Sequence, residues 1–193
     1  MAISLSKGAR VNLSKETPGL KNVRVGLGWD VNQADTGGDF DLDVSAFLVD
    51  SNGKCPTEKH FVYFKNTDSP CGAVHHHGDN RTGEGEGDDE KIDVKLDKVD
   101  PKIERIVFIV TIYDANARKQ NFGQVRNPYI RIVDLDTNKE LAKYELDEDF
   151  STETGVNFGE LYRKDGSWRF KAVGDGYKKE LADFVKDFGI NPE

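Results

Sequence analysis

The sequence has few of the features that would place a protein in a membrane or in the secretory pathway. No apolar run approaches the roughly 20 residues that span a bilayer, which argues against direct membrane insertion. The first residues, Met-Ala-Ile-Ser-Leu-Ser-Lys, lack the apolar core of a signal peptide. We therefore expect a cytoplasmic protein.

Cysteine and clustered positive charge are also scarce. With only Cys55 and Cys71 and no secretory signal, the sequence favours free thiols over a disulfide. The net charge is −8, and no basic stretch offers a surface for phosphates, which argues against nucleic acid as a partner.

A length of 193 residues suits a single domain, residues 1–193, with one buried core.

Negative charge is in excess, and it is concentrated in two acidic segments, residues 39–43 and 79–90. Together they hold nine of the 35 acidic residues and one of the 27 basic residues, which leaves 26 of each sign elsewhere. The two segments therefore account for the whole net charge. Carboxylates at this density repel one another unless a cation lies among them.

Both acidic segments have the composition of a calcium site. Asp39, Asp41 and Asp43 alternate along an expected strand, which would place three like charges on one face. In residues 79–90, carboxylates, an amide and the carbonyls beside the glycines are candidate ligands: Asp79, Asn80, Thr82, Gly83, Glu84, Gly85, Asp88, Asp89 and Glu90. Because Ca²⁺ takes about six to eight oxygen ligands, this many suggests two ions. The alternative is a solvated acidic loop.

The apolar pattern predicts an all-β fold. Apolar and polar residues alternate over 23–31, 39–46 and 92–96, and the continuous apolar run 106–113 is expected to form a central strand. Further strands are expected at 61–64, 129–135, 141–146, 156–163 and 168–173. Turn sequences at 50–53 and 165–166, with a hairpin turn at 134–139, favour an antiparallel β-sandwich.

One stretch near the C-terminus departs from the strand pattern. Apolar residues at positions 177, 181, 184, 185 and 188 have the spacing of an amphipathic helix, closed by Gly189 and Pro192. We expect this C-terminal helix to pack on the surface of a sheet.

Other residues leave alternatives open. His75, His76 and His77 suit either a transition metal or a solvated loop, but adjacent residues on a regular strand cannot all face one ion. Asp114 and Asn116 suit either a turn or further metal ligands.

The sequence shows no recognisable pair of nucleophile and base, and we do not expect an enzyme. Two alternatives use the same carboxylates: a metal-dependent hydrolase with Arg81 as its substrate-binding cation, and a Ca²⁺-dependent binder of membrane surfaces.

Several motifs, in order along nearly the whole chain, resemble the tellurite-resistance TerD family. They are Ile3-Ser-Leu-Ser-Lys-Gly8, Gly26-Leu-Gly-Trp-Asp30, Asp39-Phe-Asp-Leu-Asp43, the glycine–acid run 78–90, Ile112-Tyr-Asp-Ala115, Phe122-Gly-Gln-Val-Arg-Asn127, Phe158-Gly-Glu-Leu-Tyr-Arg163 and Gly189-Ile190. The chain departs from the usual pattern of the family at Cys71 and at 75–77.

The resemblance implies a β-sandwich that binds Ca²⁺ through Asp39, Asp41, Asp43, Asp79, Asn80 and the run 83–90. It further implies a role in resistance to tellurite, other toxic agents and phage, without known catalytic activity. The partners that it implies are other Ter proteins, including a membrane-embedded one.

Overall fold

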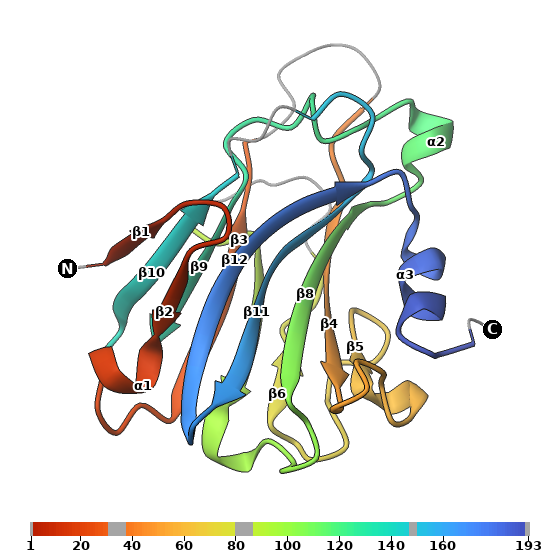
Figure 1. Ribbon diagram of the computed structural model, residues 1–193. Coiled ribbons are helices and arrows are strands. Elements are labelled where there is room, and N and C mark those ends of the chain that lie inside the picture. Colours follow the sequence, from red (N-terminus) through yellow and green to blue (C-terminus); the bar gives the residue numbers. More distant parts are fainter. Residues whose placement is uncertain (1, 31–37, 80–86, 147–149, 192–193) are drawn as a thin grey trace.

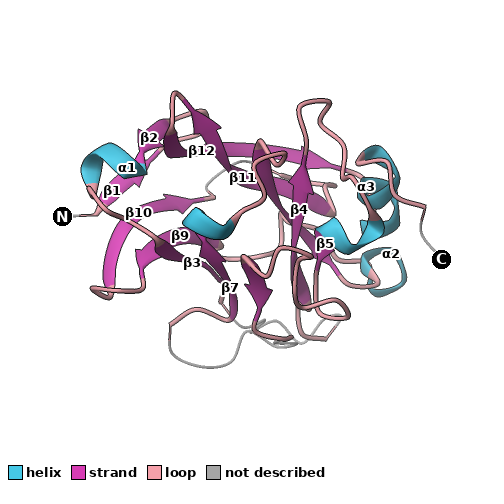
Figure 2. Cartoon of the chain, turned by 90° about the horizontal axis from the view of Figure 1, so that it is seen from below, coloured by secondary structure: helices cyan, strands magenta, loops and turns pink. Residues whose placement is uncertain are grey.

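The computed structural model describes residues 2–30, 38–79, 87–146 and 150–191. These residues form two six-stranded sheets that face each other as two layers (Figure 2). The apolar side chains between the layers form one extensive core. The predicted β-sandwich is confirmed.

Sheet A has the spatial order β1-β10-β9-β3-β7-β6. Its strands are Ile3–Leu5 (β1), Lys139–Glu145 (β10), Tyr129–Asp134 (β9), Asn22–Gly28 (β3), Glu90–Lys95 (β7) and Val74–His76 (β6). The pairs are antiparallel except β1 with β10, which is parallel.

Sheet B has the spatial order β2-β12-β11-β8-β4-β5, and its pairs are all antiparallel. Its strands are Arg10–Asn12 (β2), Ser167–Tyr177 (β12), Gly155–Lys164 (β11), Arg105–Ile112 (β8), Leu42–Val49 (β4) and Phe61–Val62 (β5). The apolar run 106–113 lies in β8, between β11 and β4, as a central strand should.

Five short helices accompany the sheets within the described residues. They are Leu13–Glu16 (α1), Glu58–His60 (η1), Leu96–Lys98 (η2), Ala115–Arg118 (α2) and Leu181–Asp187 (α3). None of these helices has the length and apolar character needed to cross a bilayer.

The C-terminal helix α3 lies on the outer face of sheet B (Figure 1). Its Phe184 and Val185 pack against Phe47 of β4 and against β8, so these two strands are buried on both faces. Burial of each such side chain contributes about 1.5–3 kcal/mol. Helix packing therefore explains why residues 106–110 of β8 are apolar on both faces of the strand.

The predicted helix begins too early, because Tyr177 is the last residue of β12. Its backbone pairs with Gly155 of β11, so it lies in the sheet and cannot be part of the helix. The helix begins after Glu180, whose amide donates to the Asp183 carboxylate at 3.0 Å in a capping box. At the other end, Gly189 has a φ of +82°, and its amide donates to the Lys186 carbonyl, as a helix-ending glycine should.

The predicted turns are confirmed. Asp165 and Gly166, with φ of 52° and 72°, join β11 to β12. In the β9–β10 hairpin the Asp134 carboxylate accepts hydrogen bonds from the amide of Asp136 and the hydroxyl of Thr137. This carboxylate therefore stabilises a turn.

Candidate metal centre

The first acidic segment is only partly a strand. The predicted strand over 39–46 is wrong at its start, because β4 begins at Leu42 and leaves Asp39 and Asp41 before it. Asp39 is exposed, and its carbonyl accepts hydrogen bonds from Arg118 and Gln120 near α2. The Asp41 carbonyl still accepts a hydrogen bond of 2.8 Å from the Tyr113 amide, next to the first regular pair of β4 with β8. Asp39 alone is therefore held away from the strand, and it lies outside the group that Asp41 and Asp43 form.

Two carboxylates of this segment meet a third from the second segment. Asp41 and Asp43 are buried, and each places an oxygen within 4.8 Å of the others and of an oxygen of the exposed Asp79. Among the described residues, this acidic cluster is the group of acids, histidines and cysteines that comes together closely enough to hold a metal ion. It joins two segments that are about 35 residues apart in the sequence.

Buried polar contacts fix the acidic cluster to both sheets. The Glu90 carboxylate, at the start of β7, accepts a hydrogen bond of 2.6 Å from the Val44 amide of β4. His76 of β6 lies within 3.2 Å of the Val44 carbonyl through Nε2, and its Nδ1 lies 2.9 Å from the Gly78 amide. These contacts place Asp43, which precedes Val44, next to Asp79, which follows Gly78.

The contacts of His76 also fix its protonation. The Gly78 amide can only donate, so Nδ1 accepts, and the ring proton lies on Nε2 and is donated to the Val44 carbonyl. Burial lowers the pKa of His76, which favours this neutral form. His76 is therefore a structural link between β4 and β6, a role that no pattern in the sequence predicted.

Asp88 is held by protein side chains. Its carboxylate receives two hydrogen bonds from the Arg131 guanidinium, at 2.7 and 3.0 Å, and one from the Tyr129 hydroxyl at 3.0 Å. A Cβ atom at Gly26 would overlap this carboxylate, and one at Gly28 would overlap the Tyr129 ring. The two glycines of β3 thus allow Asp88 and Tyr129 to lie flat on sheet A.

Asp89 lies at the margin of a cavity of about 650 Å³, which Trp29, Asp30, Tyr129 and Glu145 also line. Its carboxylate accepts a hydrogen bond of 2.9 Å from the Trp29 amide. Burial raises the pKa of Asp89, and the neighbouring charges of Asp88 and Asp30 add to the increase. Asp89 is thus a partly buried carboxylate outside the acidic cluster.

The structure thus brings together Asp41, Asp43 and Asp79, and it places Asp88, Asp89 and Glu90 in the contacts just described. Five predicted ligands lie outside the described residues: Asn80, Thr82, Gly83, Glu84 and Gly85. Arg81, the proposed substrate-binding cation of the hydrolase alternative, also lies outside them.

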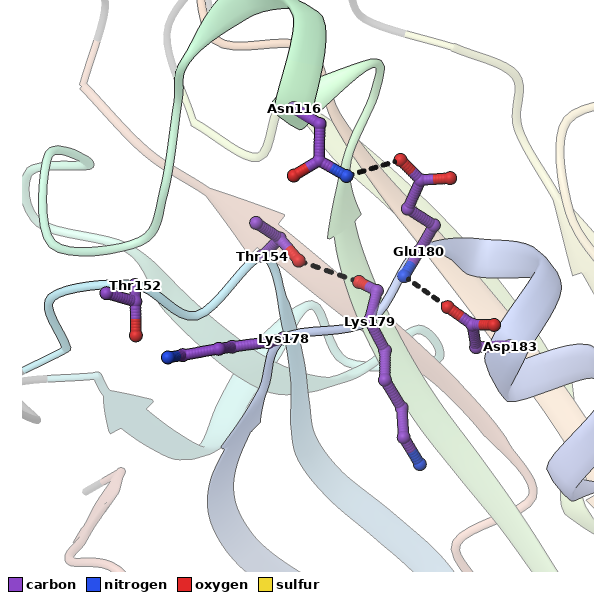
Figure 3. A pocket seen from close by; sticks show the side chains of 7 residues that line it. All are labelled: Asn116, Thr152, Thr154, Lys178, Lys179, Glu180 and Asp183. Atoms are coloured by element: carbon purple, nitrogen blue, oxygen red, sulfur yellow. Dashed lines mark hydrogen bonds between the residues drawn. The ribbon is translucent and has the colours of Figure 1, made fainter.

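Asn116 lines a second cavity, of about 350 Å³ (Figure 3), and Asp114 precedes it by two residues in the chain. Asp114, with a φ of 52°, precedes α2, which agrees with the turn alternative. The Asn116 amide donates to Glu180 at 2.9 Å, and Lys179, which also lines the cavity, pairs with Asp187 at 2.6 Å. Polar side chains around this cavity therefore stabilise the entry to α3.

The two cysteines are free thiols in different surroundings. Burial raises the pKa of Cys55 to about 12. Burial opposes ionisation of Cys71 as well, but hydrogen bonding with Ser69 and backbone groups outweighs it, so the pKa of Cys71 lies below the ordinary value.

A thiol reagent at pH 8 is therefore expected to modify one group rapidly, Cys71, because the thiolate is the reactive form. Cys71→Ser should abolish the rapid phase, and Cys55→Ser should leave it unchanged; the measurement is the release of the reagent's chromophore with time. A rapid phase that persists in Cys71→Ser would contradict this assignment.

Comparison with known proteins identifies the family. The model of the TerD domain matches residues 1–188. The chain is 54% identical over 191 residues to tellurium resistance protein TerD of Serratia marcescens, with 99% of each chain covered. It is 52% identical over 190 residues to general stress protein 16U of Bacillus subtilis, with 98% of each chain covered.

A solved structure shares the fold. The crystal structure of a homologue of telluride resistance protein (TerD) from Streptomyces coelicolor superposes with a TM-score of 0.69 at 25% identity, covering 90% of this chain and all of the other. The family model, the close relatives and the shared fold agree with the motifs in the sequence, and the chain belongs to the TerD family.

Proposed function

We propose that the chain is a calcium-binding, non-enzymatic protein of the cytoplasmic stress response, with a role in resistance to tellurite and other toxic agents. The names of its relatives, which refer to tellurium resistance and to general stress, support the biological part of this proposal. The acidic cluster of Asp41, Asp43 and Asp79 supports the calcium part.

The cluster fits Ca²⁺ in its donor atoms and in its dimensions. All three residues offer carboxylate oxygens, which Ca²⁺ prefers. Two oxygens bound to one Ca²⁺ at about 2.3–2.6 Å lie no more than about 5 Å apart, and the carboxylate oxygens here lie within 4.8 Å of one another. Further ligands, for a second ion as well, would come from the partly buried Asp89 and from Asn80, Thr82, Gly83, Glu84 and Gly85.

Calcium in this position would neutralise charge that the fold concentrates, and it would fasten residues 79–90 to β4. We propose that the fastened segment is the surface that docks to other Ter-family proteins, including a membrane-embedded one. Calcium would then control docking without any catalytic step.

Calorimetric titration of chelator-stripped protein with Ca²⁺, and with Mg²⁺ as control, tests this proposal. We expect saturable binding of one or two Ca²⁺ and much weaker binding of Mg²⁺. At a hundredfold excess over Kd, the ion should add about 2.7 kcal/mol to the free energy of unfolding. For a chain of this size, the melting temperature should then rise by roughly 5–10 °C.

Two results would contradict the calcium proposal: no saturable binding, or equal affinity for Ca²⁺ and Mg²⁺. The docking step is tested separately, by mixing the protein with a purified Ter-family relative in Ca²⁺ and in chelator. Calcium binding with no difference in complex formation would retain the metal site and reject docking.

A further inference from the structure

The histidine run 75–77 alternates across the edge of sheet A. His76 points inward and is 2% exposed, whereas His75 and His77 are both exposed on the other side. The strand β6, which contains His75, is the edge strand of the sheet, and the His77 amide extends its pairing by donating to the Lys91 carbonyl. Residues two apart on an extended chain share a face, so the fold places these two imidazoles side by side.

Each exposed imidazole is oriented by a carboxylate. Nδ1 of His75 lies 2.8 Å from an oxygen of Asp68, and Nε2 of His77 lies 2.7 Å from an oxygen of Asp93. Asp93 is itself held by two hydrogen bonds from Arg24, at 2.7 and 3.0 Å. When a neutral imidazole donates one N–H to a carboxylate, its other nitrogen carries the lone pair that can bind a metal.

The remaining ring nitrogens are Nε2 of His75 and Nδ1 of His77. Among the described residues, neither nitrogen has a hydrogen-bond partner in the structure. The two ring centroids lie 4.9 Å apart, with the planes at 79°. A tetrahedral ion with two metal–nitrogen bonds of about 2.0–2.1 Å holds two imidazole centroids roughly 5 Å apart, so the spacing already suits a shared ion.

From this arrangement we propose that His75 and His77 bind one divalent late transition-metal ion, Zn²⁺, Ni²⁺ or Cu²⁺, with Asp68 and Asp93 as the carboxylates that orient them. Imidazole ligands favour these ions over Ca²⁺, which takes oxygen. The histidine pair is therefore distinct in chemistry from the acidic cluster, and the proposal does not depend on calcium binding there. Water completes the coordination, because both imidazoles are exposed.

The test is a calorimetric titration with Zn²⁺, Ni²⁺ and Cu²⁺ of tag-free protein in a fixed excess of Ca²⁺, which occupies oxygen sites. We expect one ion per chain and at least tenfold weaker binding in the double variant His75→Gln/His77→Gln. Asp68→Asn should weaken binding about tenfold, the usual size of an effect through an orienting carboxylate. Exposed Asp97→Asn, a matched change of charge away from the histidines, should have no effect.

Two further measurements separate this site from other sites for the metal. Asp43→Asn, in the acidic cluster, should leave Zn²⁺ affinity within about twofold of the parent. The imidazole ¹⁵N signals of His75 and His77 should shift on addition of Zn²⁺, while those of the buried His60 stay unchanged.

The proposal is overturned if the double variant binds all three metals as tightly as the parent, or if only Asp43→Asn abolishes binding. Absence of saturable binding in the parent would overturn it as well. Because both side chains are exposed, the variants should fold, which a melting scan without metal checks. If the double variant melts early, the single substitutions His75→Gln and His77→Gln carry the same comparison, and each should weaken binding at least tenfold.

Discussion

Replacing Asp43 with asparagine is expected to weaken Ca²⁺ binding at least tenfold, a loss of about 1.4 kcal/mol in binding free energy. Asp43 is buried, and its carboxylate lies within 4.8 Å of those of Asp41 and Asp79. Asparagine has nearly the same shape and keeps one oxygen, but it removes the charge that attracts the ion. Calorimetric titration of the chelator-stripped variant measures the change.

The matched control for this prediction is Asp39→Asn, in the same segment. Asp39 is exposed and lies outside the acidic cluster, so its substitution should change the calcium affinity by less than about threefold. Equal affinities of Asp43→Asn and the parent would refute the calcium assignment of the cluster. A larger effect of Asp39→Asn than of Asp43→Asn would show that the ion binds nearer to Asp39 than to the acidic cluster.

The second large effect is expected on stability, from Asp88→Asn. The variant should lose about 2–3 kcal/mol in the free energy of unfolding, because asparagine replaces one of the two carboxylate oxygens that accept from Arg131 by an NH₂ group and removes the negative charge that faces the guanidinium. The Asp88 side chain is only 2% exposed, but that of Arg131 is 32% exposed, so water partly compensates the guanidinium. Chemical denaturation in the presence of chelator measures the loss free of any metal effect.

Gly26→Ala tests the contact between Asp88 and Arg131 by placing a methyl group where the Asp88 carboxylate lies. A Cβ atom at Gly26 would overlap the Asp88 carboxylate, which Arg131 and Tyr129 hold in place. This variant should therefore be destabilised by a similar amount, whereas Asp97→Asn, at an exposed carboxylate, should stay within about 0.5 kcal/mol of the parent.

The stability and calcium measurements together decide the role of Asp88. If it anchors the loop to sheet A, Asp88→Asn should lower stability and change calcium affinity less than Asp43→Asn does. Unchanged stability with a calcium affinity as low as that of Asp43→Asn would instead make Asp88 a ligand, and the contact with Arg131 incidental.

The sequence by itself determined the family and the longer strands, but not the three-residue strands β1, β2 and β6. Period-two alternation marks β3 and β7, and the continuous apolar run marks the central strand β8, because burial on one face or on both leaves a direct trace in residue order. Turn residues such as Asp165-Gly166 act locally, so the turns could also be predicted from the sequence. The starts of β4 and α3 were misplaced, since distant contacts with Arg118, Gln120 and β11 decide where those elements begin.

Only the tertiary structure decided which acidic residues form the acidic cluster and which are held by other groups of the protein. Residue order shows a dense run of carboxylates, but it does not show that Arg131, 43 residues from Asp88, takes that carboxylate, or that Glu90 bonds to the Val44 amide. The paired glycines 26 and 28 were the one local signal of a close approach to β3. Likewise, only the position of β6 at the sheet edge separates the buried His76 from its two exposed neighbours. Side-chain partners that lie far apart in the chain leave no periodic trace in the sequence, and the packing of the two sheets selects them.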